Sequence, residues 1–147
     1  MLLQYLNLRE DEAVLLKYTR PLSFEPEPAE CHFNVWLKRN SDGGSTQHGW
    51  VLAQDKSHAF AEAIFHTVWK SPESKLVDVT PRFDEEKRLL FVPDHEHHIE
   101  LSHHEGAPAI NTYDNVRLQG HTVVTPLESI KVVLQSDFIH KHNLWPW

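Results

Sequence analysis

Short turns between apolar runs are the feature that most restricts how this chain can fold. The runs cover residues 49–54, 61–70, 75–80 and 88–92, and only residues 71–74 separate the second from the third. Aromatic and β-branched residues in these runs favour strands. Because parallel neighbours need a crossover of a dozen or more residues, strands this close together are predicted to be antiparallel. The middle of the chain is therefore expected to form a small antiparallel sheet.

Two helices are predicted before this sheet. Residues 8–18 place carboxylates ahead of an apolar stretch, which suits a short helix because negative charge stabilises a helix N-terminus. A second helix is expected to begin at Cys31 and to stop near Asn40. The sequence Ser-Asp-Gly-Gly-Ser at 41–45 is a strong helix break.

A third helix is predicted near the C-terminus, over residues 126–136. Thr125 suits its N-cap, and Glu128 three residues later completes a capping box. The fold expected from these elements is α+β, with the N-terminal helices packed on a small antiparallel sheet and a helix at the C-terminal end. No repeat or composition shift divides the chain, so residues 1–147 are expected to form a single domain.

Composition excludes several classes of protein. Of the 147 residues, 40% are apolar and 24% are charged, which is ordinary for a globular domain with its own core. The net charge of −7 argues against a nucleic-acid-binding surface. Apolar runs fall short of the roughly 20 residues that a membrane span requires. One cysteine forms no internal disulfide and the N-terminus lacks a signal-peptide pattern, so a cytoplasmic protein is expected.

Three residues suggest thiol chemistry. Cys31 opens a predicted helix, and a thiol pKa falls at a helix N-terminus or beside an imidazolium. His66 lies on the strand 61–70, and the turn that follows folds the strand of Asp78 back along it. A histidine can move the proton while a carboxylate orients its ring. Cys31, His66 and Asp78 are therefore the candidate nucleophile, base and orienting acid.

These residues support more than one interpretation. A Cys31–His66–Asp78 triad would catalyse acyl transfer on an amide or thioester of a protein or small molecule, by hydrolysis, deamidation or transamidation. A single cysteine is also a common buried hydrophobe, and the acidic Glu30 beside it opposes thiolate formation. The chain would then be a non-catalytic binding or structural module. Thirdly, the same three side chains could bind zinc, with water as the fourth ligand.

Four further residues are candidates for contact with a substrate. Trp50 and Trp69 could form the walls of a groove beside the thiol, or they could be core residues. Asn34 lies one helical turn after Cys31, and Glu62 lies four residues before His66. These two could support the site, or they could be a helix-surface amide and a solvent-facing carboxylate.

The remaining motifs concern metals and partners. Residues 94–104 are rich in histidine and carboxylate, but they lack the paired ligand doublets of a structural zinc site. They are interpreted as a loop or sheet edge with adventitious metal affinity, and no cofactor is expected. Trp145 and Trp147 in the apolar C-terminal tail are expected to dock on their own domain or on a second subunit, which would make a homo-oligomer.

The order of short motifs resembles a family of small, largely uncharacterised bacterial and phage-associated proteins. The similarity covers about residues 30–94. Its blocks are Cys31-His32-Phe33-Asn34-Val35, Gly49-Trp50, Glu62-Ala63-Ile64-Phe65-His66-Thr67-Val68-Trp69, Leu76-Val77-Asp78-Val79-Thr80-Pro81 and Leu90-Phe91-Val92-Pro93-Asp94. More distantly, the histidine and aspartate blocks are similar to those of transglutaminase-like and papain-like cysteine enzymes. That resemblance implies the same order of roles, with Cys31 as nucleophile, His66 as base and Asp78 as its partner.

Overall fold

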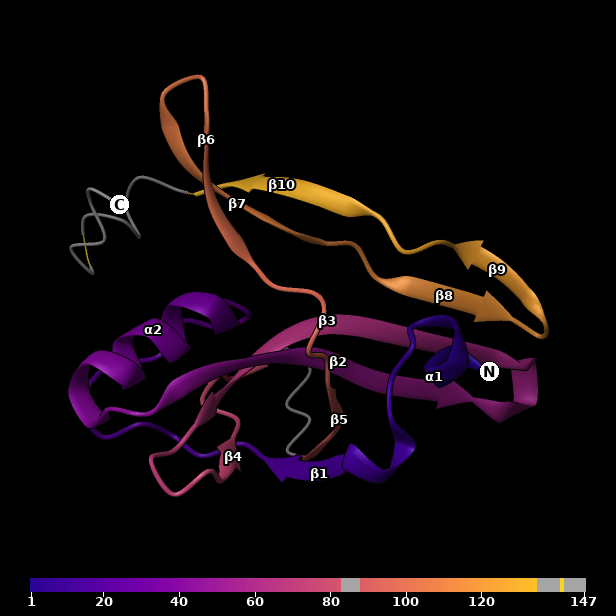
Figure 1. Ribbon diagram of the computed structural model, residues 1–147, viewed down its shortest axis with the longest axis horizontal. Coiled ribbons are helices and arrows are strands. Elements are labelled where there is room, and N and C mark those ends of the chain that lie inside the picture. Colours follow the sequence, from indigo (N-terminus) through magenta and orange to yellow (C-terminus); the bar gives the residue numbers. More distant parts are fainter. Residues whose placement is uncertain (83–87, 135–140, 142–147) are drawn as a thin grey trace.

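A computed structural model shows a predominantly β fold and describes residues 1–82, 88–134 and 141 (Figure 1). Its helices are α1 (Leu2–Tyr5), α2 (Cys31–Asp42) and the 3₁₀ turns η1 (Glu10–Glu12) and η2 (Lys56–His58). Its strands are β1 (Val14–Lys17), β2 (Ser45–Asp55), β3 (Phe60–Lys70), β4 (Leu76–Val77), β5 (Arg88–Pro93), β6 (Glu100–His104), β7 (Ala107–Tyr113), β8 (Val116–Gln119), β9 (Thr122–Thr125) and β10 (Ser129–Val133).

In this described part of the chain the strands form two antiparallel sheets. The larger has seven strands in the order β1-β5-β2-β3-β8-β9, with β4 also paired to β3. At its centre β2 and β3 form one long hairpin, paired from Ser45↔Lys70 to Asp55↔Phe60. The smaller sheet has the order β10-β7-β6. The predicted antiparallel sheet in the middle of the chain is therefore confirmed.

The two faces of the central hairpin bury different clusters. Trp50 and Phe65 belong to the cluster on one face, with Leu2, Leu6, Ala63, Val116 and Leu118. Val51 and Val68 belong to the other, with Leu16, Leu89 and Phe91. Alternation of side chains along a strand produces this division. The two faces consequently present different chemistry at neighbouring positions of β3.

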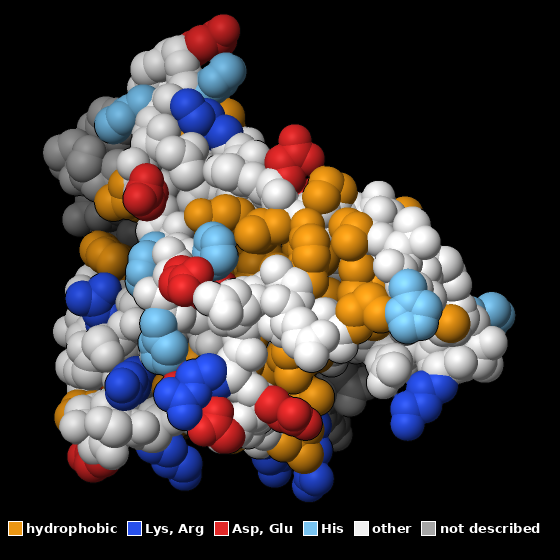
Figure 2. All heavy atoms as spheres, turned by 45° about the vertical axis from the view of Figure 1, so that its right-hand side comes forward, with side chains coloured by type: hydrophobic (Ala, Val, Ile, Leu, Met, Phe, Trp, Pro, Cys, Tyr) orange, Lys and Arg blue, Asp and Glu red, His pale blue; other side chains and the backbone are white. Residues whose placement is uncertain are grey.

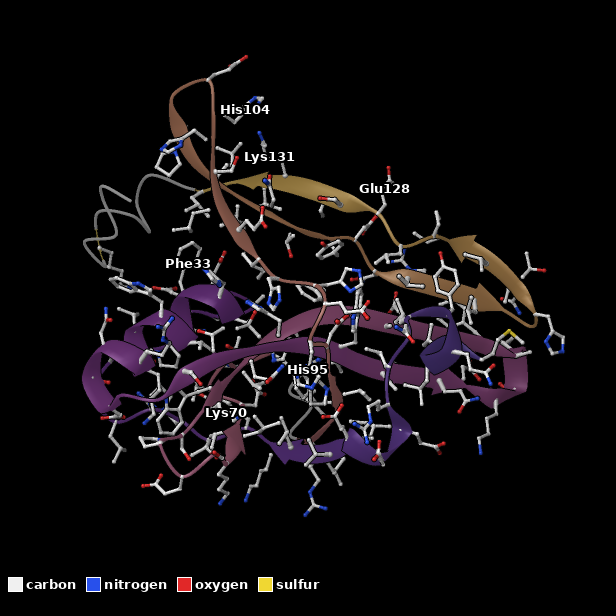
Figure 3. All side chains as sticks on the ribbon, viewed as in Figure 1. Phe33, Lys70, His95, His104, Glu128 and Lys131 are labelled. Carbon is white, nitrogen blue, oxygen red and sulfur yellow. The ribbon has the colours of Figure 1, made fainter. Side chains whose placement is uncertain are left out.

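Helix α2 packs between β3 and the smaller sheet. Phe33 and Val35 of this helix are both buried. The ring of Phe33 points from α2 toward the smaller sheet (Figure 3), where it contacts a cluster that includes Ile110. The helix ends at Asp42, and Gly43 with φ +74° donates its N–H to the carbonyl of Arg39 over 2.9 Å. Positive φ at this position favours glycine. The predicted start of this helix at Cys31 is confirmed.

The predicted α+β architecture is wrong. Residues 8–18 form the 3₁₀ turn η1 and strand β1 rather than a helix. In β1 the side chains of Val14 and Leu16 turn inward while Leu15 and Lys17 are exposed. The pairing of β1 with β5, from Val14↔Phe91 to Lys17↔Arg88, supplies hydrogen-bond partners that local sequence does not reveal.

The predicted C-terminal helix is also wrong. Residues 129–133 form β10, paired with β7 from Ser129↔Tyr113 to Val133↔Ala109. Ile130, Val132 and Val133 are β-branched, and they favour a strand once a partner strand is available. Residues 135 and 136, at the end of the predicted helix, lie outside the described part of the chain, as do Trp145 and Trp147.

The histidine-rich stretch divides into a loop and an edge strand, as predicted. Residues 95–99 form a loop, and residues 100–104 form β6 at the edge of the smaller sheet. Figure 3 shows His95 near β5 and His104 at the far end of β6. None of the helices within residues 1–82, 88–134 and 141 has the length and apolar character to cross a bilayer.

Candidate functional site

His66 and Asp78 are in direct contact. Nε2 of His66 lies 3.0 Å from Oδ1 of Asp78. The β3–β4 pairing, with Trp69 opposite Val77, places these two residues as diagonal neighbours on one face of the sheet. Both side chains are buried, and Asp78 has no exposed surface. The backbone N–H of Thr80 donates to the same carboxylate oxygen over 3.3 Å, which fixes its position.

A glycine leaves room beside the histidine. Gly49 is opposite His66 in the β2–β3 register. A Cβ on Gly49 would lie only 2.4 Å from the ring of Phe91. Because Gly49 lacks this atom, the Phe91 ring packs edge-on to His66, with ring centroids 6.4 Å apart. The absence of a side chain at Gly49 therefore allows the ring of Phe91 to pack against the imidazole of His66.

Cys31 approaches the same imidazole from the first turn of α2. The half-buried thiol forms hydrogen bonds with His66 and with both the backbone and the side chain of Thr67. Since Asp78 occupies Nε2 of His66, Nδ1 is the ring nitrogen left to face the sulfur. The structure thus brings together the three residues of the predicted triad, from a helix start, a strand and the segment after β4.

Electrostatics favours the charged form of the cysteine–histidine pair. Burial by itself raises the pKa of the Cys31 thiol, but the positive charge of His66 and hydrogen bonds from His66 and Thr67 outweigh it, so the pKa is lowered. Burial by itself lowers the pKa of His66, but the Cys31 thiolate and the Asp78 carboxylate outweigh it and raise the pKa to about 10. Each of the two groups therefore favours the charged form of the other.

Hydrogen bonds hold α2 at both ends. Near its start, the buried amide of Asn34 donates to the carbonyl of Glu27 over 2.8 Å and to the hydroxyl of Thr80 over 3.2 Å. It also accepts from the N–H of Glu27 over 3.0 Å. At its end, the indole of Trp69 donates to the carbonyl of Gly43 over 2.8 Å. The position of Cys31 relative to β3 is therefore set by contacts on both sides of the thiol.

A cavity of about 310 Å³ opens beside the thiol. It is lined by Ala29, Cys31, Ile64, Phe65, His66, Thr80 and Arg82. The first N–H groups of a helix have no partner within the helix, so α2 directs donors toward the end that carries Cys31. A carbonyl in this cavity would lie beside the thiol of Cys31 and the imidazole of His66.

The four predicted substrate contacts lie outside this lining. Trp50 is fully buried and donates its indole N–H to Asp94 over 2.8 Å. The roles of Asn34 and Trp69 are the helix contacts described above. Glu62 accepts from Arg117 of β8 over 2.6 Å. All four side chains therefore make their hydrogen bonds within the fold, outside the cavity beside the thiol.

The sequence prediction missed two residues of the site. Thr67 supplies two hydrogen bonds to the thiol, and its hydroxyl also lies 3.1 Å from Nδ1 of His48. Burial lowers the pKa of His48 to about 4, so this imidazole is neutral at pH 7 and can donate from Nδ1 to the threonine. Alternation would have placed Thr67 on the opposite face from His66. Because Cys31 lies at the edge of β3, its thiol can contact both His66 and Thr67 although they lie on opposite faces of the strand.

Among the described residues, neither a metal-binding group nor the larger groove brings the predicted site residues together in another way. No group of three histidine, cysteine or carboxylate side chains in that part of the chain is arranged to hold a metal ion. A larger groove of about 580 Å³ lies at the turn end of the β2–β3 hairpin, beside α1. Figure 2 shows hydrophobic side chains gathered on this side of the molecule. The lining of the groove includes Leu2, Leu52 and Phe60 and none of the predicted site residues.

Comparison with models of protein families, with curated proteins and with solved structures gives no match to the chain.

Proposed function

We propose that this chain is a cysteine-dependent acyl-transfer enzyme that acts on an amide or a thioester. The supporting observation is that one buried imidazole, that of His66, contacts Asp78 at 3.0 Å through Nε2 and also hydrogen-bonds the thiol of Cys31. Structural ion pairs also shift pKa values, but this pair lies beside a cavity and at a helix N-terminus.

In the first half of the reaction the Cys31 thiolate attacks the carbonyl carbon of the substrate. A carbon–sulfur bond forms while the carbonyl π electrons move to oxygen, where backbone N–H groups of the first turn of α2 can stabilise the charge. The tetrahedral intermediate then collapses and breaks the bond to the leaving amine or thiol. The His66 imidazolium gives its proton to this leaving group, and a thioester on Cys31 remains.

In the second half, water or an amine attacks the thioester carbonyl. The neutral imidazole of His66 takes a proton from the nucleophile, and the Cys31 thiolate leaves when the second tetrahedral intermediate collapses. Water gives hydrolysis or deamidation, and an amine gives transamidation. Throughout, Asp78 accepts from Nε2 and so keeps Nδ1 directed at the sulfur. A reducing compartment such as the cytoplasm would keep the thiol in its active form.

The experiment that tests this function is trapping of the thioacyl intermediate. The full chain is mixed with p-nitrophenyl acetate near pH 7, and the acyl group is located by mass spectrometry while nitrophenol release is followed. We expect a burst of nitrophenol with acetyl on Cys31, absent in Cys31→Ser and strongly slowed in His66→Ala. His97→Ala is the matched control, because His97 contacts Asp94 rather than the thiol. Acetylation that is equally fast in His66→Ala would contradict the proposal.

A further inference from the structure

Main-chain groups of β3 alternate between its two edges. The carbonyl of His48 accepts from the N–H of Asp94 over 3.0 Å, so the main chain of His48 faces β5 and not β3. His48 is opposite Thr67, and two residues further along Trp50 is opposite Phe65. Pairs two residues apart in an antiparallel ladder are of the same type. The N–H and C=O groups of Thr67 and Phe65 therefore point to the edge of β3 that faces away from β2.

Strands of the described part of the chain pair with this edge only in part. β8 pairs with residues 60–63 of β3, and β4 pairs with residues 69 and 70. Within residues 1–82, 88–134 and 141, no strand pairs with residues 64–68 on that side. The backbone of Thr67 is already hydrogen-bonded to the Cys31 thiol. The N–H and C=O of Phe65, a residue that is only 9% exposed, therefore point toward the gap between these two paired segments.

The gap in the sheet edge coincides with the cavity beside the thiol. Ile64, Phe65 and His66 line that cavity together with Cys31. Thr67, which contacts the sulfur, lies two residues along the strand from Phe65, a distance of about 7 Å in extended chain. A peptide paired with Phe65 would therefore carry its own carbonyl groups to the thiol within one or two residues.

We propose that the acyl donor is a peptide in extended conformation, whose main chain pairs with Phe65 at the open edge of β3 while a carbonyl next to the paired residue meets Cys31. This assignment rests on the proposed acyl transfer and adds the substrate class. Addition of a strand to a sheet edge is a recurring mode of peptide recognition, in which main-chain hydrogen bonds provide affinity. A small amide without a flanking main chain could not make these two bonds.

The test uses N-acetyl-trialanine chloromethyl ketone, whose CH₂ carbon is attacked by the thiolate with loss of chloride to leave a thioether on Cys31. Three analogues each carry one methyl group on a different amide nitrogen. Iodoacetamide, which has no peptide main chain, reports the intrinsic reactivity of the thiol. Second-order rate constants for Cys31 alkylation are measured on the full chain near pH 6, with free cysteine as the reference for each reagent.

We expect one methylated analogue to react about tenfold more slowly than the parent peptide, since it lacks the N–H that bonds the carbonyl of Phe65. The other two should stay within about twofold, and all four should react equally with free cysteine. Fast alkylation by iodoacetamide with no position-dependent loss would overturn the peptide assignment and leave the acyl-transfer proposal intact. Slow alkylation by iodoacetamide with a position-dependent loss would uphold peptide docking and contradict thiol activation. Slow and position-independent reactions would overturn both.

Discussion

Replacing His66 by glutamine separates the charge of the imidazole from its volume. Glutamine can still hydrogen-bond Asp78 and the thiol, but it is never cationic. The variant loses the favourable charge that lowers the pKa of Cys31, while the burial that raises this pKa remains. We therefore expect the thiol pKa to rise.

The size of this effect follows from the strength of charged hydrogen bonds. A hydrogen bond to a charged partner contributes about 1.5–3 kcal/mol, which corresponds to a thiol pKa higher by about one to two units. Below both pKa values the thiolate fraction then falls about 10- to 100-fold. The thiolate that forms is more nucleophilic, because reactivity rises with pKa with a Brønsted slope of about 0.4–0.5. The net expectation is alkylation slower by about 3- to 15-fold near pH 6.

The assay is the pH dependence of Cys31 alkylation by iodoacetamide, measured for wild type, His66→Gln and His97→Gln. Circular dichroism and the unfolding midpoint confirm that each variant is folded. His97→Gln should match wild type, since His97 bonds Asp94 and not the thiol. An identical pH profile for wild type and folded His66→Gln would refute the reasoning, because the histidine would then contribute no charge to the thiol.

Two other predictions concern groups around the thiol. Thr67→Val removes a hydroxyl that bonds the Cys31 thiolate and should lower the thiolate fraction about tenfold near pH 6. Thr67→Ser retains the hydroxyl and should keep the wild-type thiolate fraction. Equal alkylation rates for the two variants would contradict the role of the hydroxyl. The pKa of His48, like that of His32, is lowered by burial to about 4 in the folded chain, below the unfolded value. Keeping these two imidazoles neutral stabilises the folded chain, and this stabilisation is complete above the unfolded pKa of about 6.5 and is lost as pH falls toward about 4. The free energy of unfolding should therefore decrease by about 2 kcal/mol per histidine between pH 7 and pH 5. In urea titrations at the two pH values, His48→Gln should show a smaller decrease, and an unchanged decrease would contradict this account.

Local signals predicted the hairpin of β3 and β4 and the helix that begins at Cys31. The run 61–70 is long and rich in β-branched and aromatic residues, and the turn at 71–74 returns the chain beside it. The same hairpin places Asp78 next to His66, as its geometry predicted. These features could be predicted because their partners are close in sequence.

The wrong predictions involve partners that are distant in sequence. Residues 14–17 pair with residues 88–91, and residues 129–133 pair with residues 109–113. Two local patterns favour a helix only where no partner strand is available. They are the acidic residues before an apolar run and the capping box at Thr125 and Glu128. Strand pairing supplied from a distant segment overrides these local preferences.

The surroundings of the site were harder to predict than the triad itself. Asn34 was expected near a substrate, but its amide bonds Glu27 and Thr80 on two sides of the helix start. Thr67 lies opposite His48, on the face of β3 away from His66, yet it reaches the thiol because Cys31 lies at the strand edge. Roles of this kind depend on where the loop before α2 crosses the sheet, which no periodicity in the sequence encodes.

The protonation state of His66 is the most direct test of a thiolate–imidazolium pair. Nuclear magnetic resonance of the chain with nitrogen-labelled histidine reports whether each ring nitrogen carries a proton. The account predicts that both nitrogens of His66 are protonated near pH 7 and that the ring loses its proton only near pH 10, a behaviour abolished in Cys31→Ala. A neutral His66 ring at pH 7, titrating near the ordinary histidine value of about 6.5, would contradict it.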